Sequence, residues 1–256
     1  MSVLEATGLV KTYGGQRALD GFTLHVAAGE IVGLVGHNGA GKTTFAEVVS
    51  GLVRPETGQV LVRGINALAR PQAARRLVSS CPQETALYPA ATVAEHLRLF
   101  GSLAGLRGAG LRRAADDIAE RMDLASVANK PTGLLSGGQR KRVQAATALI
   151  AEKPLLLLDE PTVGADPATR SRLLAVVADR AAAGAAVVYT THYLPELAEL
   201  GASVAVAASG RVIARGTLSL QEVSALLGAA GTPDDDARDD GSREAEQEER
   251  HDADAA

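Results

Sequence analysis

The chain has 256 residues, a formal net charge of −4, 46% hydrophobic and 22% charged residues, enough for one large or two small globular domains. No apolar run approaches the roughly 18–20 residues that span a bilayer, and the N-terminus lacks the features of a signal peptide, so we expect a cytoplasmic protein. The single cysteine, Cys81, excludes an internal disulfide, and we expect it to be a buried structural residue.

The first elements along the chain read as a small β region. Residues 3–32 alternate and turn, with Phe22, Leu24 and Val26 separated by polar residues. Residues 59–63 (Gln-Val-Leu-Val-Arg) predict a further strand.

A glycine-rich loop follows the apolar run Ile31–Val35 and precedes residues 43–51, which have helical character. The loop fits the pattern G-x-x-x-x-G-K-[ST], in which backbone N–H groups surround phosphates, Lys42 reaches the β/γ oxygens and the Thr43 hydroxyl binds Mg²⁺. An ordinary glycine-rich turn is the alternative, but the flanking strand and helix argue against it. The predicted phosphate-binding residues are Gly36, His37, Asn38, Gly39, Ala40, Gly41, Lys42, Thr43 and Thr44.

From about residue 84 to residue 135 the apolar pattern has a helical period. A glycine-rich segment, Gly101–Gly110, is expected to separate two helices. We expect both apolar stripes to pack in the core and not to form a binding groove. The stripes are Val93, Leu97, Phe100 and Ala104, then Leu111, Ala115, Ile118 and Met122.

The run Leu155–Leu158 ends in two carboxylates, Asp159 and Glu160. A buried parallel strand would place both acids at its carboxyl end, where α/β sheets bind ligands. Asp159 fits a role in holding Mg²⁺ through water, and Glu160 could polarise an attacking water as a general base. Alone, this pattern could end any strand, but it complements the phosphate-binding loop that contains Lys42.

The last part of the predicted fold comprises a helix over 168–183, a strand over 185–191 and a hairpin over 203–215 that turns at Ser209-Gly210. Strands that alternate with helices favour an α/β fold with a parallel sheet.

The C-terminal residues 232–256 hold 11 Asp/Glu against 3 Lys/Arg, a net charge of −8, whereas residues 1–231 hold 19 acids and 23 bases, a net charge of +4. Because this acidic segment has almost no apolar side chains beyond Ala, we expect it to be disordered. It is either a solubilising extension or a docking or regulatory tail.

The pentapeptide Leu135-Ser-Gly-Gly-Gln139, followed by a basic cluster and a helical stretch, resembles the signature of ATP-binding cassette (ABC) proteins. In isolation it could be a glycine turn before a helix, but it lies between the two nucleotide motifs. A γ-phosphate could bind at this helix N-terminus. The signature residues predicted to bind nucleotide are Ser136, Gly137, Gly138 and Gln139.

The resemblance to the ABC family covers most of residues 1–225 and implies further site residues. Tyr13 is similar to the aromatic that stacks on adenine, although a surface-turn tyrosine remains the alternative. Gln83 matches the glutamine that senses Mg²⁺ and water, Asp166 matches the loop that crosses the dimer interface, and His192 matches the histidine that contacts the γ-phosphate. The implied catalytic residues are therefore Glu160, His192 and Gln83, with Mg²⁺ held by Thr43, Gln83 and Asp159.

The resemblance also implies an α/β fold with three parts: a P-loop NTPase core with a parallel sheet, an antiparallel β subdomain, and an inserted α-helical subdomain at about residues 84–140. All three would lie in one nucleotide-binding domain of residues 1–231.

The implied activity is ATP hydrolysis with Mg²⁺, coupled to transmembrane transport. Two chains would close head-to-tail around two ATP molecules, and a separate transmembrane permease would contact the stretch between Gln83 and Leu135. Residues 80–100, with Thr191-His-Tyr193, look like the bacterial branch that exports drugs, antibiotics, polysaccharides or lipids. We therefore expect peripheral association with the inner face of the cell membrane, through the permease, and no nucleic-acid partner.

Two other functions fit the same catalytic motifs. A non-transport cassette ATPase that acts on ribosomes or DNA usually has two fused cassettes, coiled-coil insertions or basic patches, and the acidic C-terminal segment would repel nucleic acid. A regulator that binds ATP but barely hydrolyses it is disfavoured because Glu160 and His192 are both present.

Overall fold

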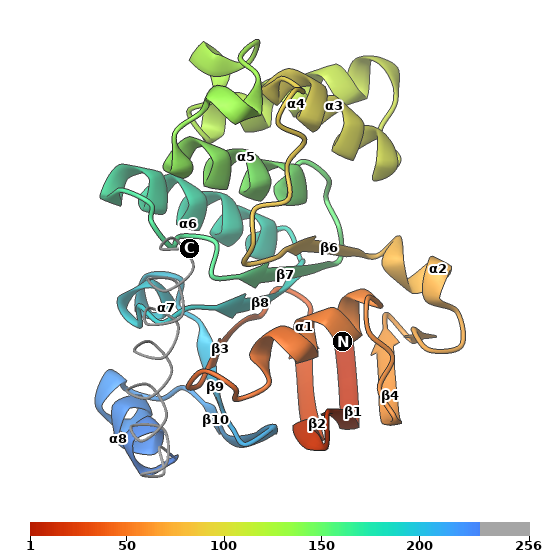
Figure 1. Ribbon diagram of the computed structural model, residues 1–256, viewed down its shortest axis with the longest axis vertical. Helices are drawn as coiled ribbons and strands as arrows, with labels where there is room; N and C mark the ends of the chain where they lie inside the picture. Colours follow the sequence, from red (N-terminus) through yellow and green to blue (C-terminus); the bar gives the residue numbers. More distant parts are fainter. Residues whose placement is uncertain (231–256) are drawn as a thin grey trace, which may run out of the picture.

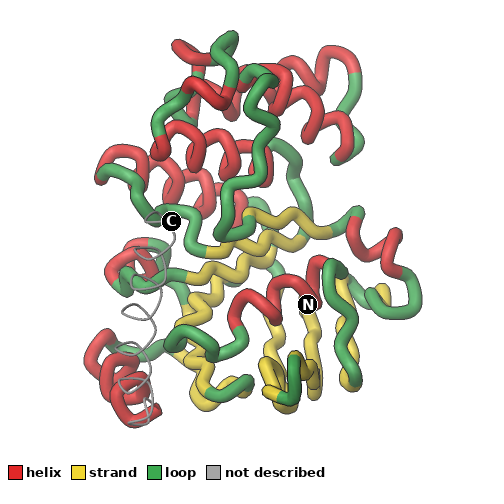
Figure 2. The backbone as a smooth tube through the Cα atoms, in the orientation of Figure 1, coloured by secondary structure: helices red, strands yellow, loops and turns green. Residues whose placement is uncertain are grey.

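The computed structural model describes residues 1–230, so the expectations for residues 232–256 lie outside the described residues. Two β-sheets, eight α-helices and two short 3-10 helices, Ala125–Val127 and Thr132–Leu134, make up the described part of the fold (Figure 1). Helices α5 and α6 cover one face of the larger sheet, α3 and α4 pack on α5 farther from the sheet, and helix α1 lies between the two sheets (Figure 2).

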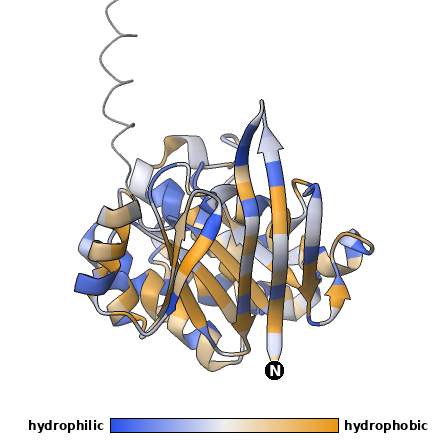
Figure 3. Ribbon diagram, turned by 90° about the horizontal axis from the view of Figure 1, so that it is seen from below, coloured by the Kyte–Doolittle hydropathy of each residue, from blue (hydrophilic) through white to orange (hydrophobic). Residues whose placement is uncertain are grey.

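The smaller sheet is antiparallel and has the strand order β2-β1-β4-β5. Alternate residues of its strands face the core, as the alternating hydropathy along the strands in Figure 3 illustrates. The predicted strand over 59–63 is present but starts two residues earlier. The strands are β1 (Ser2–Tyr13), β2 (Gln16–Ala27), β4 (Thr57–Val62) and β5 (Ile65–Asn66).

The larger sheet has the order β10-β9-β3-β8-β7-β6, and every neighbouring pair is parallel except the closing hairpin of β9 and β10. The predicted α/β fold with a parallel sheet is therefore confirmed. The strands are β3 (Ile31–Val35), β6 (Val78–Cys81), β7 (Leu155–Asp159), β8 (Ala186–Thr190), β9 (Ser203–Ala208) and β10 (Arg211–Gly216).

The core has two layers because successive side chains of a strand point to opposite faces of the sheet. Leu156 and Leu158 of β7 join the cluster under the helices, whereas Leu155 and Leu157 join the cluster that faces α1 and the smaller sheet. All five residues of β3, β7 and β8 are buried. Burial on both faces explains why these strands read as continuous apolar runs.

The helices that the sequence predicts from an apolar periodicity are present. Both predicted stripes face the core at Val93, Leu97, Ala115, Ile118 and Met122. The helices are α1 (Lys42–Ser50), α2 (Pro71–Arg75), α3 (Val93–Leu103), α4 (Gly108–Arg121), α5 (Gly137–Leu149), α6 (Pro167–Ala182), α7 (Pro195–Glu199) and α8 (Leu220–Ala230).

The predicted break at Gly101–Gly110 is only partly correct, because α3 continues to Leu103. Gly101 is buried inside α3, and a Cβ there would lie 2.6 Å from Leu111 Cδ1. The glycine thus allows α3 and α4 to approach closely and does not end a helix. Across residues 1–230, no helix combines the length and apolar character that a membrane span requires.

Candidate active site

The predicted site residues follow strands whose carboxyl ends lie at the same edge of the larger sheet. The glycine-rich loop follows β3, the acidic pair ends β7, His192 follows β8 and Gln83 follows β6. These four strands are parallel, with β8 between β3 and β7. Parallel sheets bind ligands at this edge.

The glycine-rich loop leads directly into the N-terminus of α1. Gly41 is the N-cap with φ 97°, and a Cβ at this position would lie 2.5 Å from the carbonyl oxygen of Ala18. Only glycine fits both restrictions. The first turn of α1 has no acidic residue, so its N–H groups and the helix dipole favour an anion.

The ammonium group of Lys42 lies inside this loop. Its Nζ donates hydrogen bonds to the carbonyl oxygens of Gly36 at 2.7 Å and His37 at 3.1 Å. Burial lowers the pKa of Lys42, while the carboxylates of Glu160 and Asp159 counteract that shift. The cation is therefore placed between the loop and the acidic pair, where phosphate oxygens would add further negative charge.

A Mg²⁺ ion fits the oxygen donors of Thr43 and Asp159. Thr43 Oγ1 donates to Asp159 Oδ2 at 3.1 Å, so a hydroxyl of α1 and a carboxylate of β7 are adjacent. Within residues 1–230 no group of three or more His, Cys, Asp or Glu side chains is placed to hold a metal. This sparse set of hard oxygen donors suits an ion that keeps several waters and is completed by substrate phosphates.

Glu160 is held in a strained and buried position. Its φ of 47° lies in the left-handed region, and its N–H donates to Thr190 Oγ1 at 2.9 Å. The carboxylate contacts two other predicted catalytic side chains: His192 Nε2 lies 2.5 Å from Oε1, and Gln83 Nε2 donates to Oε2 at 3.2 Å. The structure thus brings all three predicted catalytic residues together.

A cavity of about 290 Å³ opens between the loop and the acidic strand end. Tyr13, at the end of β1, is not among the residues that line this cavity. Burial together with the Glu47 carboxylate raises the pKa of Tyr13, while a hydrogen bond with Thr44 opposes the shift. Tyr13 is half exposed beside the first turns of α1. The residues lining the cavity are Ala18, Asn38, Gly39, Ala40, Gly41, Lys42, Thr43, Thr44, Gln83 and Glu160.

The signature residues begin α5 and are not among the residues that line this cavity. Ser136 is the N-cap, and it forms a reciprocal capping box with Gln139. Asp166 caps α6 by accepting hydrogen bonds from the N–H and hydroxyl groups of Thr169, which lower its pKa. Neither Ser136 nor Asp166 is brought to the phosphate-binding loop of its own chain.

Sequence reasoning missed the residues of α5 that hold the segment around Gln83. Gln144 Nε2 donates to the carbonyl oxygens of Pro82 at 2.5 Å and Glu84 at 2.8 Å, and Lys141 Nζ donates to that of Gln83. Gln144 is buried among alanines and valine of α5. A polar residue on the apolar stripe of a helix was the available signal.

Comparison with known proteins identifies relatives over most of the chain. The model of the family described as "ABC transporter" matches residues 19–163. Daunorubicin resistance ATP-binding protein DrrA3 of Streptomyces coeruleorubidus is 39% identical over 84% of this chain and 68% of its own length. A solved ATP-binding subunit of an ABC transporter is 31% identical with a TM-score of 0.80, over 90% of this chain and 95% of that structure.

A second solved structure adds a nucleotide state. It is described as the dimeric structure of a post-hydrolysis state of an ATP-binding cassette bound to ADP and Pi. It is 25% identical with a TM-score of 0.77, and the match covers 85% of this chain and all of that one.

Proposed function

This chain belongs to the ABC transporter family, as an ATP-binding and ATP-hydrolysing subunit, and from that membership we propose that it powers a membrane exporter of drug-like or antibiotic-like molecules. The name of the daunorubicin-resistance relative supports this substrate class. The subunit would lie on the inner face of the cell membrane, held there by a separate permease.

The observation that carries the catalytic proposal is the Glu160 carboxylate, which contacts both His192 and Gln83. Glu160 accepts a proton from the attacking water, and the two neighbours orient that water and the γ-phosphate. Lys42 and the N–H groups of the glycine-rich loop bind the phosphates. Thr43, Gln83 and Asp159 would hold Mg²⁺, which would supply positive charge to offset that of the phosphates.

The dimer completes the nucleotide site. Ser136 and its neighbours begin a helix that could bind a γ-phosphate, yet they do not line the cavity at Lys42. A second copy would bring its signature residues and its Asp166 to this cavity, and the dimeric relative supports that arrangement. ATP binding would favour closure because both subunits contact the same nucleotide.

Substitution of Glu160 by Gln tests this function. Glu160→Gln should bind ATP normally, lose about 10²–10⁴-fold in turnover, and form a stable dimer with ATP. Glu120→Gln, an exposed change on α4, is the matched control. Turnover and ATP affinity are measured by phosphate release and equilibrium binding, and the dimer by light scattering. Full turnover in Glu160→Gln would contradict the role of general base.

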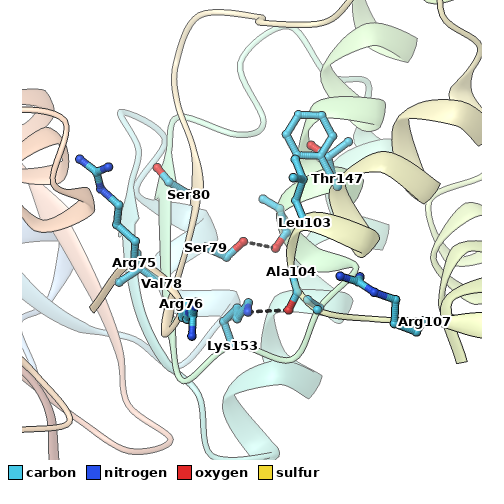
Figure 4. Close-up of a pocket in the computed structure, with 14 residues that line it drawn as sticks. Arg75, Arg76, Val78, Ser79, Ser80, Leu103, Ala104, Arg107, Thr147 and Lys153 are labelled. Carbon is cyan, nitrogen blue, oxygen red and sulfur yellow. Dashed lines mark hydrogen bonds between the residues drawn. The ribbon is translucent and has the colours of Figure 1, made fainter. Parts of the chain in front are cut away.

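The permease would dock in a second cavity of about 660 Å³, outside the nucleotide site. It lies between the edge strand β6 and the C-terminal ends of α3 and α5 (Figure 4). Two hydrogen bonds hold its walls together: Ser79 Oγ donates to the Ala148 carbonyl at 2.5 Å, and Lys153 Nζ donates to the Ala104 carbonyl at 2.9 Å. Phe100 and Leu103 add apolar surface.

The positive charge of this groove indicates which kind of partner surface it would bind. Arg75, Arg76, Arg107 and Lys153 all line it, and none of them forms a salt bridge with a carboxylate of residues 1–230. Burial lowers the pKa of Lys153, which a carboxylate would reverse. The groove therefore fits a cytoplasmic permease helix with an acidic side chain.

Co-purification with the permease tests the groove. Arg75→Gln combined with Arg107→Gln should leave the ATPase activity of the isolated subunit unchanged and reduce recovery of the permease. Arg172→Gln, an exposed change on α6, is the control. Undiminished recovery of the permease, or equal loss with the control, would contradict docking in this groove.

A further inference from the structure

Glu196 is a buried carboxylate that the catalytic assignment leaves unexplained. It is the second residue of α7, only 1% exposed, four positions after His192. Its Oε2 accepts hydrogen bonds from Tyr189 Oη at 3.0 Å and Thr191 Oγ1 at 2.9 Å. Its Oε1 lies 3.0 Å from Arg170 Nε, as an ion pair without an aligned hydrogen bond.

These contacts fix the backbone on both sides of His192. Thr191 donates its hydroxyl proton to Glu196, and the same oxygen accepts a hydrogen bond from Tyr193 N–H at 3.0 Å. The guanidinium of Arg170 lies 4.6 Å from the centroid of the Tyr193 ring, in cation–π geometry. The residues before and after His192 are thus both bound to the Glu196–Arg170 pair.

The position of His192 depends on this support because its own side chain makes few contacts. The ring is 52% exposed, and the one polar contact recorded for it within residues 1–230 is the 2.5 Å contact with Glu160 Oε1. A side chain with one polar contact takes its position largely from its backbone.

Arg170 extends the connection to the segment that contains Asp166. Both residues belong to the first turn of α6: Asp166 is its N-cap, and Arg170 N–H donates to the Asp166 carbonyl at 3.0 Å. The segment from Glu160 to Asp166 joins β7 to this helix. The ion pair therefore connects the start of α6 to the loop of His192.

The chemistry of the pair argues for a role beyond packing. A buried carboxylate is costly unless a cation and hydrogen bonds compensate it, and an apolar residue is often as stable at such a position. Burial, and then the Glu196 carboxylate, raise the pKa of Tyr189, so its phenol remains a donor to Glu196. Three side chains, those of Tyr189, Thr191 and Arg170, thus contact the Glu196 carboxylate directly. The Tyr193 amide is connected to it through the Thr191 hydroxyl.

We propose that Glu196 and Arg170 are positioning residues that together hold His192 against Glu160 and connect its loop to the helix capped by Asp166. This inference rests on the proposed ATPase mechanism, in which His192 contacts the γ-phosphate. Loss of the pair lowers the rate of the chemical step and leaves ATP binding at Lys42 intact.

Steady-state kinetics of the full-length chain tests the pair. Glu196→Gln keeps the shape of the side chain but removes its charge, and Arg170→Met removes the partner. Each should lower kcat by about 10–100-fold, as misplaced catalytic groups do, with the KM for ATP within about twofold of wild type. The double variant should be no slower than the slower single variant, and Arg170→Lys should restore part of the rate.

Arg180→Met is the matched control, because Arg180 lies in the same helix and pairs with Glu152 at 3.0 Å. It should lower the melting temperature by less, because Glu152 is exposed, and it should leave kcat unchanged. If Glu196→Gln and Arg170→Met melt lower but keep the wild-type kcat, the pair is only structural and the inference is wrong. If wild type itself hydrolyses no ATP, the proposed function fails instead, and the two failures are distinguishable.

Discussion

Thr190 gives the most direct test of how the acidic strand end is held. It is 2% exposed at the end of β8, its hydroxyl donates to Asp159 Oδ1, and the same oxygen accepts the Glu160 N–H at 2.9 Å. Thr190→Val keeps the shape and β-propensity of the side chain but removes both hydrogen bonds. The perturbation is therefore confined to the two carboxylate residues.

The expected loss of stability follows from the partners that remain. Asp159 loses a charge-assisted hydrogen bond worth about 1.5–3 kcal/mol. The Glu160 N–H keeps a second acceptor, the Thr190 carbonyl at 3.2 Å, so its loss is smaller. A total of about 2–3 kcal/mol should lower the melting temperature by roughly 5–10 °C for a chain of this size.

Thermal unfolding and the Mg²⁺ dependence of ATP hydrolysis measure the two consequences. Because Asp159 loses its orientation, the Mg²⁺ concentration for half-maximal activity should rise about 10–100-fold. Thr190→Ser, which keeps the hydroxyl, should behave like wild type. A Thr190→Val protein that melts within 1 °C of wild type, or has an unchanged Mg²⁺ dependence, would refute this account.

Three further predictions test burial, charge and backbone geometry. Cys81 is buried and its pKa is raised to about 12, so it should resist alkylation at neutral pH and react only after denaturation. Burial alone raises the pKa of Glu30, but hydrogen bonds, first that from Ala27 N–H, lower it overall. Glu30→Gln should therefore be less stable than wild type at neutral pH. The difference should shrink as the pH falls through the lowered pKa of Glu30 in the folded state, where the wild-type carboxylate becomes protonated. A difference that stays constant with pH in urea titrations would contradict this. Gly41→Ala should lower the free energy of unfolding by about 2–3 kcal/mol and weaken ATP binding, whereas Gly39→Ala, with no atom within 4 Å of its Cβ, should cost less.

The sequence predicts those parts of the site whose chemistry is contiguous. The loop from Gly36 to Thr44 has its glycines, lysine and hydroxyl in one segment, and the run Leu155–Leu158 shows burial directly before its two acids. Local spacing also predicts the turn at Ser209-Gly210, where Ser209 has φ 47° and Gly210 has φ 73°. In each case the residues that determine the local structure lie within a few positions of one another in the sequence.

Strand β6 could not be predicted from its local sequence pattern. Its sequence, Val-Ser-Ser-Cys, has two polar residues in four and carries no strong strand signal. It forms a strand because β7 supplies a parallel ladder that pairs Val78 with Leu155 and Cys81 with Leu158. Helix α8 was missed as well, and it packs on β9. Tertiary partners determine both elements.

The contacts among the predicted catalytic residues were beyond sequence reasoning for a related reason, which β8 makes clear. Adjacent residues at the end of a strand point in different directions, so the Thr190 hydroxyl reaches Asp159 and Glu160 whereas that of Thr191 reaches Glu196. The next residue, His192, returns to Glu160. The two threonines look interchangeable in the sequence but have different partners. Thr190 binds the two acidic residues, and Thr191 binds the segment that contains His192. Because β8 lies between β3 and β7, a displacement of this strand end would move the histidine and both carboxylates relative to the phosphate-binding loop.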